Sequence, residues 1–226
     1  MATVLITGAN RGIGLEFVHQ YASDGARVFA CCRDLKGAHE LQRLAAADKR
    51  IAMHPLDVAD GTSIDALARE LRDEAIDILI NNAGILGTRS GAMDYDLWEE
   101  VFRVNTIGPF RIAQAFRKNL EHGDMRKVIT LTSGMGSTAT NSGGYYAYRA
   151  SKAAVNNAMR GLAADWAEDR FIVLVISPGW VATDMGGRGA PLSPADSVGA
   201  MRRVIAGLKR SDNGRFLDHS GQELPW

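Results

Sequence analysis

The 226-residue sequence has only two cysteines, no long apolar run and no excess of either charge. Cys31 and Cys32 are adjacent, and neighbouring cysteines rarely reach disulfide geometry, so we expect a reducing, cytoplasmic environment. No apolar run approaches the ~20 residues that cross a bilayer, and we expect neither a membrane helix nor a signal peptide. The 26 basic side chains match the 26 acidic ones, which argues against a nucleic-acid binder with a broad basic surface.

Metal-ligand patterns are also missing. The five histidines, at positions 19, 39, 54, 122 and 219, lack the spacing of metal ligands, so we predict no metal site. What remains is an ordinary globular composition, with 46% hydrophobic and 23% charged residues. The length suits one large α/β domain that spans residues 1–226.

Short β-branched runs alternate with longer helical patterns. The predicted strands lie at 3–7, 27–32, 50–54, 77–80, 127–132, 171–177 and 215–218. The predicted helices lie at 12–24, 37–47, 62–74, 95–120, 147–168 and 194–209, and Gly108-Pro109 is expected to bend the fourth. This alternation predicts a single doubly wound (Rossmann) α/β domain, with a mostly parallel seven-stranded sheet and helices on both faces. A ligand is expected at the carboxyl ends of the strands.

A glycine-rich segment follows the first predicted strand and opens the first helix. Its sequence, TGANRGIG at 7–14, lets the backbone turn tightly and approach phosphate oxygens. The helix N-terminus adds free N–H groups and a partial positive charge. We therefore predict a nucleotide site formed by Gly8, Asn10, Arg11, Gly12, Ile13 and Gly14.

The end of the second strand bears on the choice of cofactor. NAD-preferring sites usually carry an acidic residue about 20 positions past the glycines, which binds the ribose 2′-hydroxyl. That place falls at Cys32 and Arg33, and Arg33 can pair with a 2′-phosphate that Arg11 can also approach. We therefore predict NADP(H). Asp34 keeps NAD(H) open as the less favoured cofactor, because a strand longer by one or two residues would bring its carboxylate to the ribose.

Three tyrosines lie close together in YYAYRASK, at 145–152. Only Tyr148 has a lysine four residues later, and on a helix this spacing places the phenol and the Lys152 ammonium on one face. A single Tyr/Lys pair at this spacing usually lies on the protein surface and has no catalytic role. Tyr145 and Tyr146 are interpreted as packing or pocket-wall residues.

Six motifs, in this order, resemble those of the short-chain dehydrogenase/reductase family over nearly the whole chain. They are TGxxxGIG at 7–14, NNAG at 81–84, Asn105 in RVNTIGPF, Ser133 in VITLTSGMG, YxxxK at 148–152 and SPGWVATDM at 177–185. The compact branch that contains C-factor and sniffer-type carbonyl reductases is the most similar, through GGYYAYRASKAAVN and the ending GQELPW. Ser133 and Tyr148 are 15 residues apart, slightly more than is usual, so a small loop at 138–144 is expected to bulge near the substrate.

The resemblance implies an NADPH-dependent reduction of aldehydes or ketones to alcohols. Tyr148 would protonate the substrate oxygen, and Lys152 would lower the tyrosine pKa and bind the nicotinamide ribose. Ser133 would donate a hydrogen bond to the same oxygen, and Asn105 would hold a water that links Lys152 to solvent. The nicotinamide itself supplies the hydride.

The resemblance also implies the remaining cofactor contacts. Asp57 and Val58 would meet the adenine, although Asp57 also fits a helix cap or a turn. The adenine ribose would be bordered by Asn81, Ala83 and Gly84, and the nicotinamide by Pro178, Gly179, Val181 and Thr183. The substrate pocket is expected in the loops at 85–95, 134–147 and 180–195, whose sequences leave the natural substrate open.

Two other functions remain open. One is a cofactor-binding signalling or regulatory protein of the C-factor type, and the other is an NAD-dependent alcohol dehydrogenase. Apolar stripes in the fourth and fifth helices fit a homodimer interface, as in many relatives, and fit core packing equally well. The expected partner is a small carbonyl or alcohol substrate.

Overall fold

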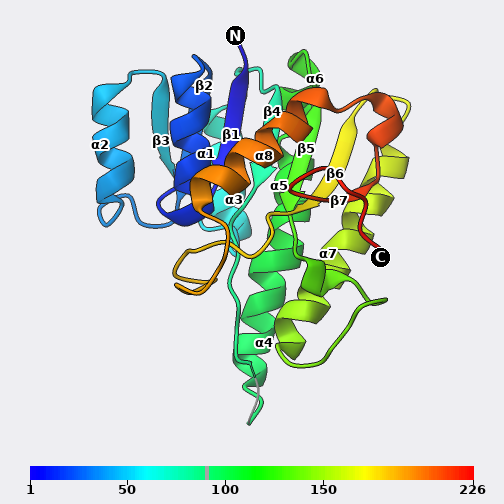
Figure 1. The fold of residues 1–226 in the computed structure, drawn as a ribbon. Helices are drawn as coiled ribbons and strands as arrows, with labels where there is room; N and C mark the ends of the chain where they lie inside the picture. The colour runs from blue at the N-terminus through cyan, green and yellow to red at the C-terminus, as the bar shows by residue number, and fades with distance from the viewer. Residues whose placement is uncertain (90–91) are drawn as a thin grey trace.

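Seven parallel strands form one sheet in the computed structural model, which describes residues 1–89 and 92–226 (Figure 1). The strands are β1 (Thr3–Thr7), β2 (Arg27–Cys32), β3 (Ile51–Pro55), β4 (Ile78–Asn81), β5 (Lys127–Leu131), β6 (Ile172–Ser177) and β7 (Phe216–Asp218). Their order is β3-β2-β1-β4-β5-β6-β7, and each neighbouring pair is parallel. The predicted doubly wound fold is confirmed, and each predicted strand agrees with the structure to within one residue.

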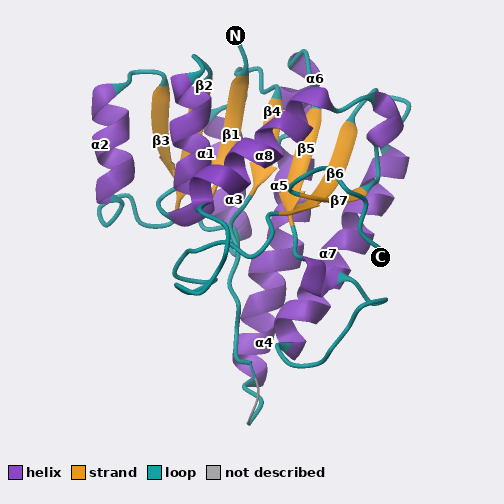
Figure 2. Ribbon diagram, viewed as in Figure 1, coloured by secondary structure: helices purple, strands orange, loops and turns teal. Residues whose placement is uncertain are grey.

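Helices cover both faces of the sheet (Figure 2). One hydrophobic core takes side chains from α3 (Gly61–Glu70), α5 (Gly108–Ala115) and α7 (Tyr146–Asp165). The other takes them from α1 (Gly12–Ser23), α2 (His39–Ala47) and α8 (Pro194–Gly207). Successive strand residues alternate between the faces, so Val4 and Ile6 enter the second core and Leu5 enters the first.

The fourth predicted helix is not continuous, and this corrects the expectation for 95–120. It divides into α4 (Tyr95–Phe102), a π-helical turn η1 (Arg103–Ile107), α5 and α6 (Arg117–His122). Pro109 has no N–H to offer the carbonyl four residues earlier, so the helix widens directly before the expected bend at Gly108-Pro109. The other predicted helices are present, with ends shifted by at most four residues.

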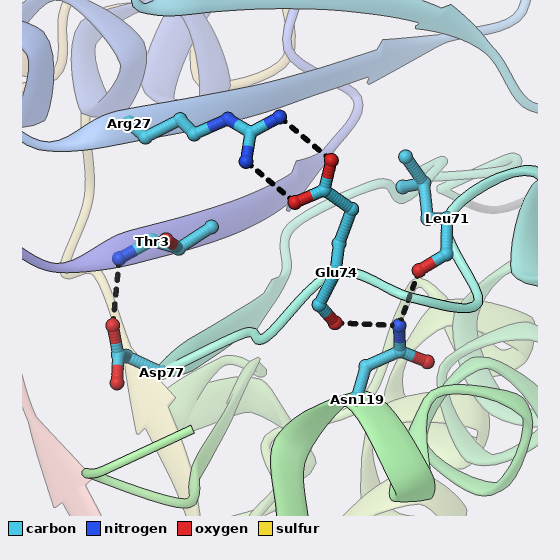
Figure 3. Close-up of polar contacts among 6 residues, drawn as sticks. All are labelled: Thr3, Arg27, Leu71, Glu74, Asp77 and Asn119. Atoms are coloured by element: carbon cyan, nitrogen blue, oxygen red, sulfur yellow. Dashed lines mark hydrogen bonds and ion pairs between the residues drawn. The ribbon is translucent and has the colours of Figure 1, made fainter. Parts of the chain in front are cut away.

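A polar network joins the elements at the amino ends of the strands (Figure 3). The Arg27 guanidinium donates to both carboxylate oxygens of Glu74, at 2.5 and 2.8 Å. The Thr3 N–H donates to Asp77 Oδ2 at 2.7 Å, and the Asn119 amide donates to the Glu74 carbonyl at 2.8 Å. These bonds tie β1, β2 and β4 to the helices at one edge of the sheet, which leaves the opposite, carboxyl edge free for a ligand.

Candidate active site

A cavity of about 620 Å³ opens at the carboxyl ends of β1 to β6, where the strand order reverses between β1 and β4. This is the position at which doubly wound sheets bind their ligands. Most of the predicted site residues line it. They are Gly8, Asn10, Arg11, Gly12, Ile13, Gly14, Arg33, Asp57, Val58, Ala83, Gly84, Tyr148, Lys152, Pro178 and Thr183.

Asn81, which is predicted to border the adenine ribose, is not among the residues that line the cavity. Asn81 is 1% exposed, and its amide donates to the Pro109 carbonyl and the Thr130 hydroxyl, at 3.2 and 3.3 Å. The next residue, Asn82, lines the cavity instead and donates to the carbonyls of Thr7 and Gly8, at 2.8 and 3.1 Å. Because side chains alternate along a strand, one position decides which asparagine faces the ligand.

Gly179 and Val181 lie behind the cavity wall rather than among its lining residues. Gly179 has φ +80°, and a side chain there would meet Leu192 and His219. Val181 is buried and pairs with Leu192 in an isolated β-bridge. This bridge brings together the two ends of the loop 182–191, which follows β6. Both residues therefore shape the segment that carries Thr183. The sequence does not single out Thr132 or Asp184, which also line the cavity.

The glycine segment folds as its composition predicts. Gly8 and Gly12 adopt positive φ angles of 65° and 54°, which residues other than glycine rarely adopt. The α1 helix then begins at Gly12, and in the described structure its first turn carries no acidic residue and no side-chain cap. Its free N–H groups therefore lie at the cavity with no acidic side chain of the first turn to compete for them, which suits a phosphate group.

We expect Gly14→Ala to abolish nucleotide binding and to destabilise the fold by ~1–3 kcal/mol, because overpacking of a tight contact forces the backbone apart. A Cβ at Gly14 would lie 2.2 Å from the Gly8 carbonyl oxygen and 2.5 Å from the Asn82 amide nitrogen. Titration with 2′,5′-ADP and urea unfolding measure the two effects. Gly161→Ala on α7 is the matched control, since a Cβ there meets nothing within 4 Å. Tight binding by Gly14→Ala would contradict the close-approach role.

Three charged side chains surround the end of β2 and the glycine segment. Arg33 is exposed on the cavity and has no ion pair among the described residues. Asp34 Oδ1 accepts from the Lys36 N–H at 2.9 Å, so this carboxylate is engaged in a local turn. Arg11 pairs with Asp184 across the cavity at 2.6 Å. Arg33 is therefore the basic group that is left available at this end of the site.

Asp57 lies in a turn, which is one of the two structural roles that its sequence context left open beside a contact with the adenine. It lines the cavity, but its Oδ1 accepts from the Ala59 N–H at 2.9 Å in a local turn. The cap of α3 is the neighbouring Asp60, whose carboxylate accepts from the N–H groups of Thr62 and Ser63. The side chain of Asp57 therefore shapes this part of the cavity as a turn residue.

Ser133 and Tyr148 come from different elements and meet at the other end of the site, where Tyr148 is among the residues that line the cavity and Ser133 is not. Ser133 lies two residues after the end of β5, and Tyr148 lies in the first turn of α7. Burial raises the pKa of Tyr148, and a hydrogen bond with Ser133 acts in the opposite direction. Lys152 was expected to lower this pKa. In the structure its ammonium lies 5.7 Å from the centre of the Tyr148 ring, and the effect of burial prevails.

Lys152 is buried, and among the described residues its ammonium has one hydrogen-bond partner. Its Nζ donates to the Leu131 carbonyl at 2.9 Å, and burial lowers its pKa from the usual 10.5 to about 8. A side chain at Gly84 would lie within 3.7 Å of this Nζ and 3.2 Å of Asn105 Oδ1, so the three residues meet at one point.

Asn105 lies in η1 and is fully buried. Its amide donates to the Ile85 carbonyl and to Ser151 Oγ, at 2.8 and 3.0 Å, and its Oδ1 accepts from the Ile85 N–H at 2.9 Å. These bonds fasten the segment after NNAG to α7. The predicted role of Asn105 in holding a water stays a prediction.

The family model for short chain dehydrogenase matches residues 2–190. The chain belongs to the short-chain dehydrogenase family. C-signal of Myxococcus xanthus is 44% identical over 164 residues, which cover 71% of this chain and 99% of that protein. The solved structure of the carbonyl reductase Sniffer of D. melanogaster matches with a TM-score of 0.96 and 32% identity over the whole of both chains. The NADPH-bound carbonyl reductase from chicken fatty liver matches with a TM-score of 0.93 and 35% identity, over 100% of this chain and 99% of that one.

These matches confirm the predicted family and the sniffer-like branch. They agree with the arrangement of the cavity in this short-chain dehydrogenase, which has the glycine segment at one end and Tyr148 and Lys152 at the other. No cluster of residues suited to a metal occurs in the part of the chain that the structure describes. Within residues 1–89 and 92–226, no helix combines the length and the apolar character that crossing a membrane requires.

We expect Lys152→Met to raise the free energy of unfolding of the cofactor-free protein by ~1–2 kcal/mol at pH 7, after the lost bond to Leu131 is counted. Below pH 8 the folded and unfolded chains both carry the charge, so the folded chain bears its full desolvation cost. Between pH 8 and 10 the folded lysine loses its proton first, and the cost falls as pH rises. The advantage of the variant should therefore shrink across this window.

Urea unfolding at pH 7 and pH 9.5 measures this difference. Lys127→Met is the matched control, because Lys127 is a second buried lysine with a lowered pKa, and its Nζ donates to the Ile205 carbonyl outside the cavity. We expect turnover to be lost only in the Lys152 variant. A Lys152→Met protein less stable than the wild type at pH 7 would contradict the interpretation.

Proposed function

We propose that this short-chain dehydrogenase is an NADPH-dependent reductase that converts aldehydes or ketones into alcohols, with Tyr148 as the acid. The observation that carries the proposal is a single cavity with the glycine segment at one end and Tyr148 and Lys152 at the other. The description of one close structural match as an NADPH-bound carbonyl reductase supports the same reaction.

The residues present fit a dinucleotide that bears a 2′-phosphate. The N-terminus of α1 and the glycine segment would hold the pyrophosphate. The Arg33 guanidinium, which has no ion pair within residues 1–89 and 92–226, would hold the 2′-phosphate. Pro178 and Thr183 would border the nicotinamide. When bound, the reduced nicotinamide supplies a hydride to the carbonyl carbon.

The protein's own part in the reaction is to supply a proton to the carbonyl oxygen. The raised pKa keeps the Tyr148 phenol protonated at neutral pH, so its O–H can donate to that oxygen and then transfer the proton as negative charge develops. Ser133 Oγ would donate a second hydrogen bond to the same oxygen. Lys152, held by the Leu131 carbonyl, would stabilise the phenolate that remains.

The test is oxidation of NADPH and of NADH by the purified protein with a panel of aldehydes, ketones and quinones. The proposal expects turnover that is faster with NADPH than with NADH. Turnover only with NADH would favour the NAD-dependent alcohol dehydrogenase, for which Asp34 would serve as the ribose ligand. Tight NADPH binding without turnover of any carbonyl would favour a binding protein.

A second candidate function rests on the similarity to C-signal. In this function the chain binds the cofactor and acts as a signalling or regulatory protein. Tyr148→Phe distinguishes the two, because a signalling role that depends only on binding would survive the loss of the phenol. The Ser133, Tyr148 and Lys152 group favours the enzyme, since a binding protein has no need of a proton donor.

Assembly and location stay predictions. Tyr95 on α4 and Tyr146 on α7 are 71% and 52% exposed, which fits a homodimer interface on these two helices. The two free cysteines, Cys31 and Cys32, are both buried and fit a cytoplasmic protein.

A further inference from the structure

The segment between Ser133 and Tyr148 has to keep two reacting side chains in register. It begins with a short 3-10 turn, η2 (Gly134–Gly136), and continues through residues 138–143, all of which are exposed. An exposed segment gains little order from a hydrophobic core. Polar interactions must therefore hold this part of the chain, and at its start the Trp226 carbonyl accepts from the Ala139 N–H at 3.1 Å and from Thr138 Oγ1 at 3.2 Å.

Arg149, the residue after Tyr148, makes the contacts that span the segment from one end to the other. Its Nε donates to the carbonyls of Gly143 and Gly144, at 3.0 and 3.1 Å, and its Nη2 donates to Ser142 Oγ at 2.9 Å. Its Nη1 reaches the Met135 carbonyl at 3.5 Å. One half-buried guanidinium thus contacts the segment shortly after Ser133 and again shortly before Tyr148.

The backbone of the segment explains why a guanidinium is needed. Gly143, Gly144 and Tyr145 adopt positive φ angles of 78°, 69° and 49° in succession. Tyr145 bears the steric cost of this conformation because it has a Cβ. The carbonyls of Gly143 and Gly144 both accept from Arg149 Nε, so this side chain stabilises the turn that the left-handed run creates.

The same turn connects to a third part of the site. The Tyr145 N–H donates to the Arg89 carbonyl at 2.8 Å, and the Arg149 N–H donates to the Tyr145 carbonyl at 2.8 Å. Residues 90–91, in the predicted pocket segment 85–95, lie outside the described residues. Arg149 itself lines a separate cavity of about 240 Å³, with Trp98 and Tyr146, so it acts from outside the main cavity.

We propose that Arg149 is a positioning residue, which holds residues 135–145 so that Ser133 and Tyr148 keep the relative placement that the reaction needs. The inference rests on the proposed reductase function. Arg149 contributes through the geometry of its planar fork of N–H donors, which reaches several acceptors at once. Lysine, with the same charge on a single nitrogen, cannot reproduce these bonds.

The test compares Arg149→Ala and Arg149→Lys with the wild type. We expect kcat/KM for carbonyl reduction to fall ~10–100-fold in both, the range that a small misplacement of reacting groups costs. The dissociation constant for NADPH should stay within about twofold, because Arg149 is not among the residues that line the main cavity. Methylguanidinium at millimolar concentration should restore part of the kcat of Arg149→Ala, which a general loss of stability would not allow.

Hydrogen exchange reports on the segment independently of turnover. We expect amides of 137–145 to exchange faster in Arg149→Ala, with those of β5 and of α7 beyond Lys152 unchanged. Arg43→Ala is the control, since this exposed arginine on α2 pairs with Glu40 far along the chain from the site.

The possible results separate the two proposals. A wild type that turns over carbonyls and an Arg149→Ala variant with kcat/KM within twofold would overturn the positioning role. A wild type with no carbonyl turnover would overturn the proposed reductase function, and hydrogen exchange would then decide on Arg149 alone. Unchanged exchange of 137–145 would overturn the positioning role in that case as well.

Discussion

Replacing Tyr148 with phenylalanine is expected to lower kcat for carbonyl reduction by ~10²–10⁴-fold, the usual contribution of a positioned proton donor. The substitution removes one oxygen and keeps the ring, which is 8% exposed and packed at the start of α7. The fold and the affinity for NADPH should therefore change little. Steady-state rates with the best carbonyl of the panel, together with a fluorescence titration of NADPH, measure both quantities.

Tyr146→Phe is the matched control for this experiment. Tyr146 lies two residues earlier on the same helix, but its side chain is 52% exposed and is not among the residues that line the main cavity. We expect its rate to stay within about twofold of the wild type, as for a surface substitution. A Tyr148→Phe protein with more than a tenth of the wild-type rate would rule out Tyr148 as the acid.

Replacing Arg33 with alanine is expected to weaken NADPH binding by ~10–100-fold, since a charge-assisted hydrogen bond contributes about 1.5–3 kcal/mol. NADH has no 2′-phosphate, so its affinity should stay within about twofold. Titration with 2′,5′-ADP and 5′-ADP isolates the same difference without turnover. Because Arg33 is exposed and has no ion pair among the described residues, its removal leaves no buried charge behind.

Arg11→Ala is the comparison for Arg33, because both arginines line the cavity. Arg11 is already paired with Asp184 at 2.6 Å, so part of its interaction with a phosphate is offset by the loss of that pair. We therefore expect a smaller loss for 2′,5′-ADP than in Arg33→Ala. Equal losses of NADPH and NADH affinity in Arg33→Ala would contradict the 2′-phosphate assignment.

The sequence alone determined the strands, all but one of the predicted helices and most of the residues around the cavity. Strand positions follow from short β-branched runs between turn residues, which are local signals, and each agrees with the structure to within one residue. The glycine segment is local as well, because its positive φ angles at Gly8 and Gly12 depend on residue type. TGANRGIG and YxxxK are short local patterns as well, and the order of all six motifs gave YxxxK its predicted role.

Only the tertiary structure decided how these residues are paired and buried. Asn81 faces the interior and Asn82 the cavity, and Arg11 meets Asp184 across a sequence separation of 173 residues. The π-helical turn at 103–107 and the raised pKa of Tyr148 also depend on what packs around them. Local sequence determines backbone preference and periodicity, whereas burial, long-range pairing and electrostatics arise only when distant segments close around one another.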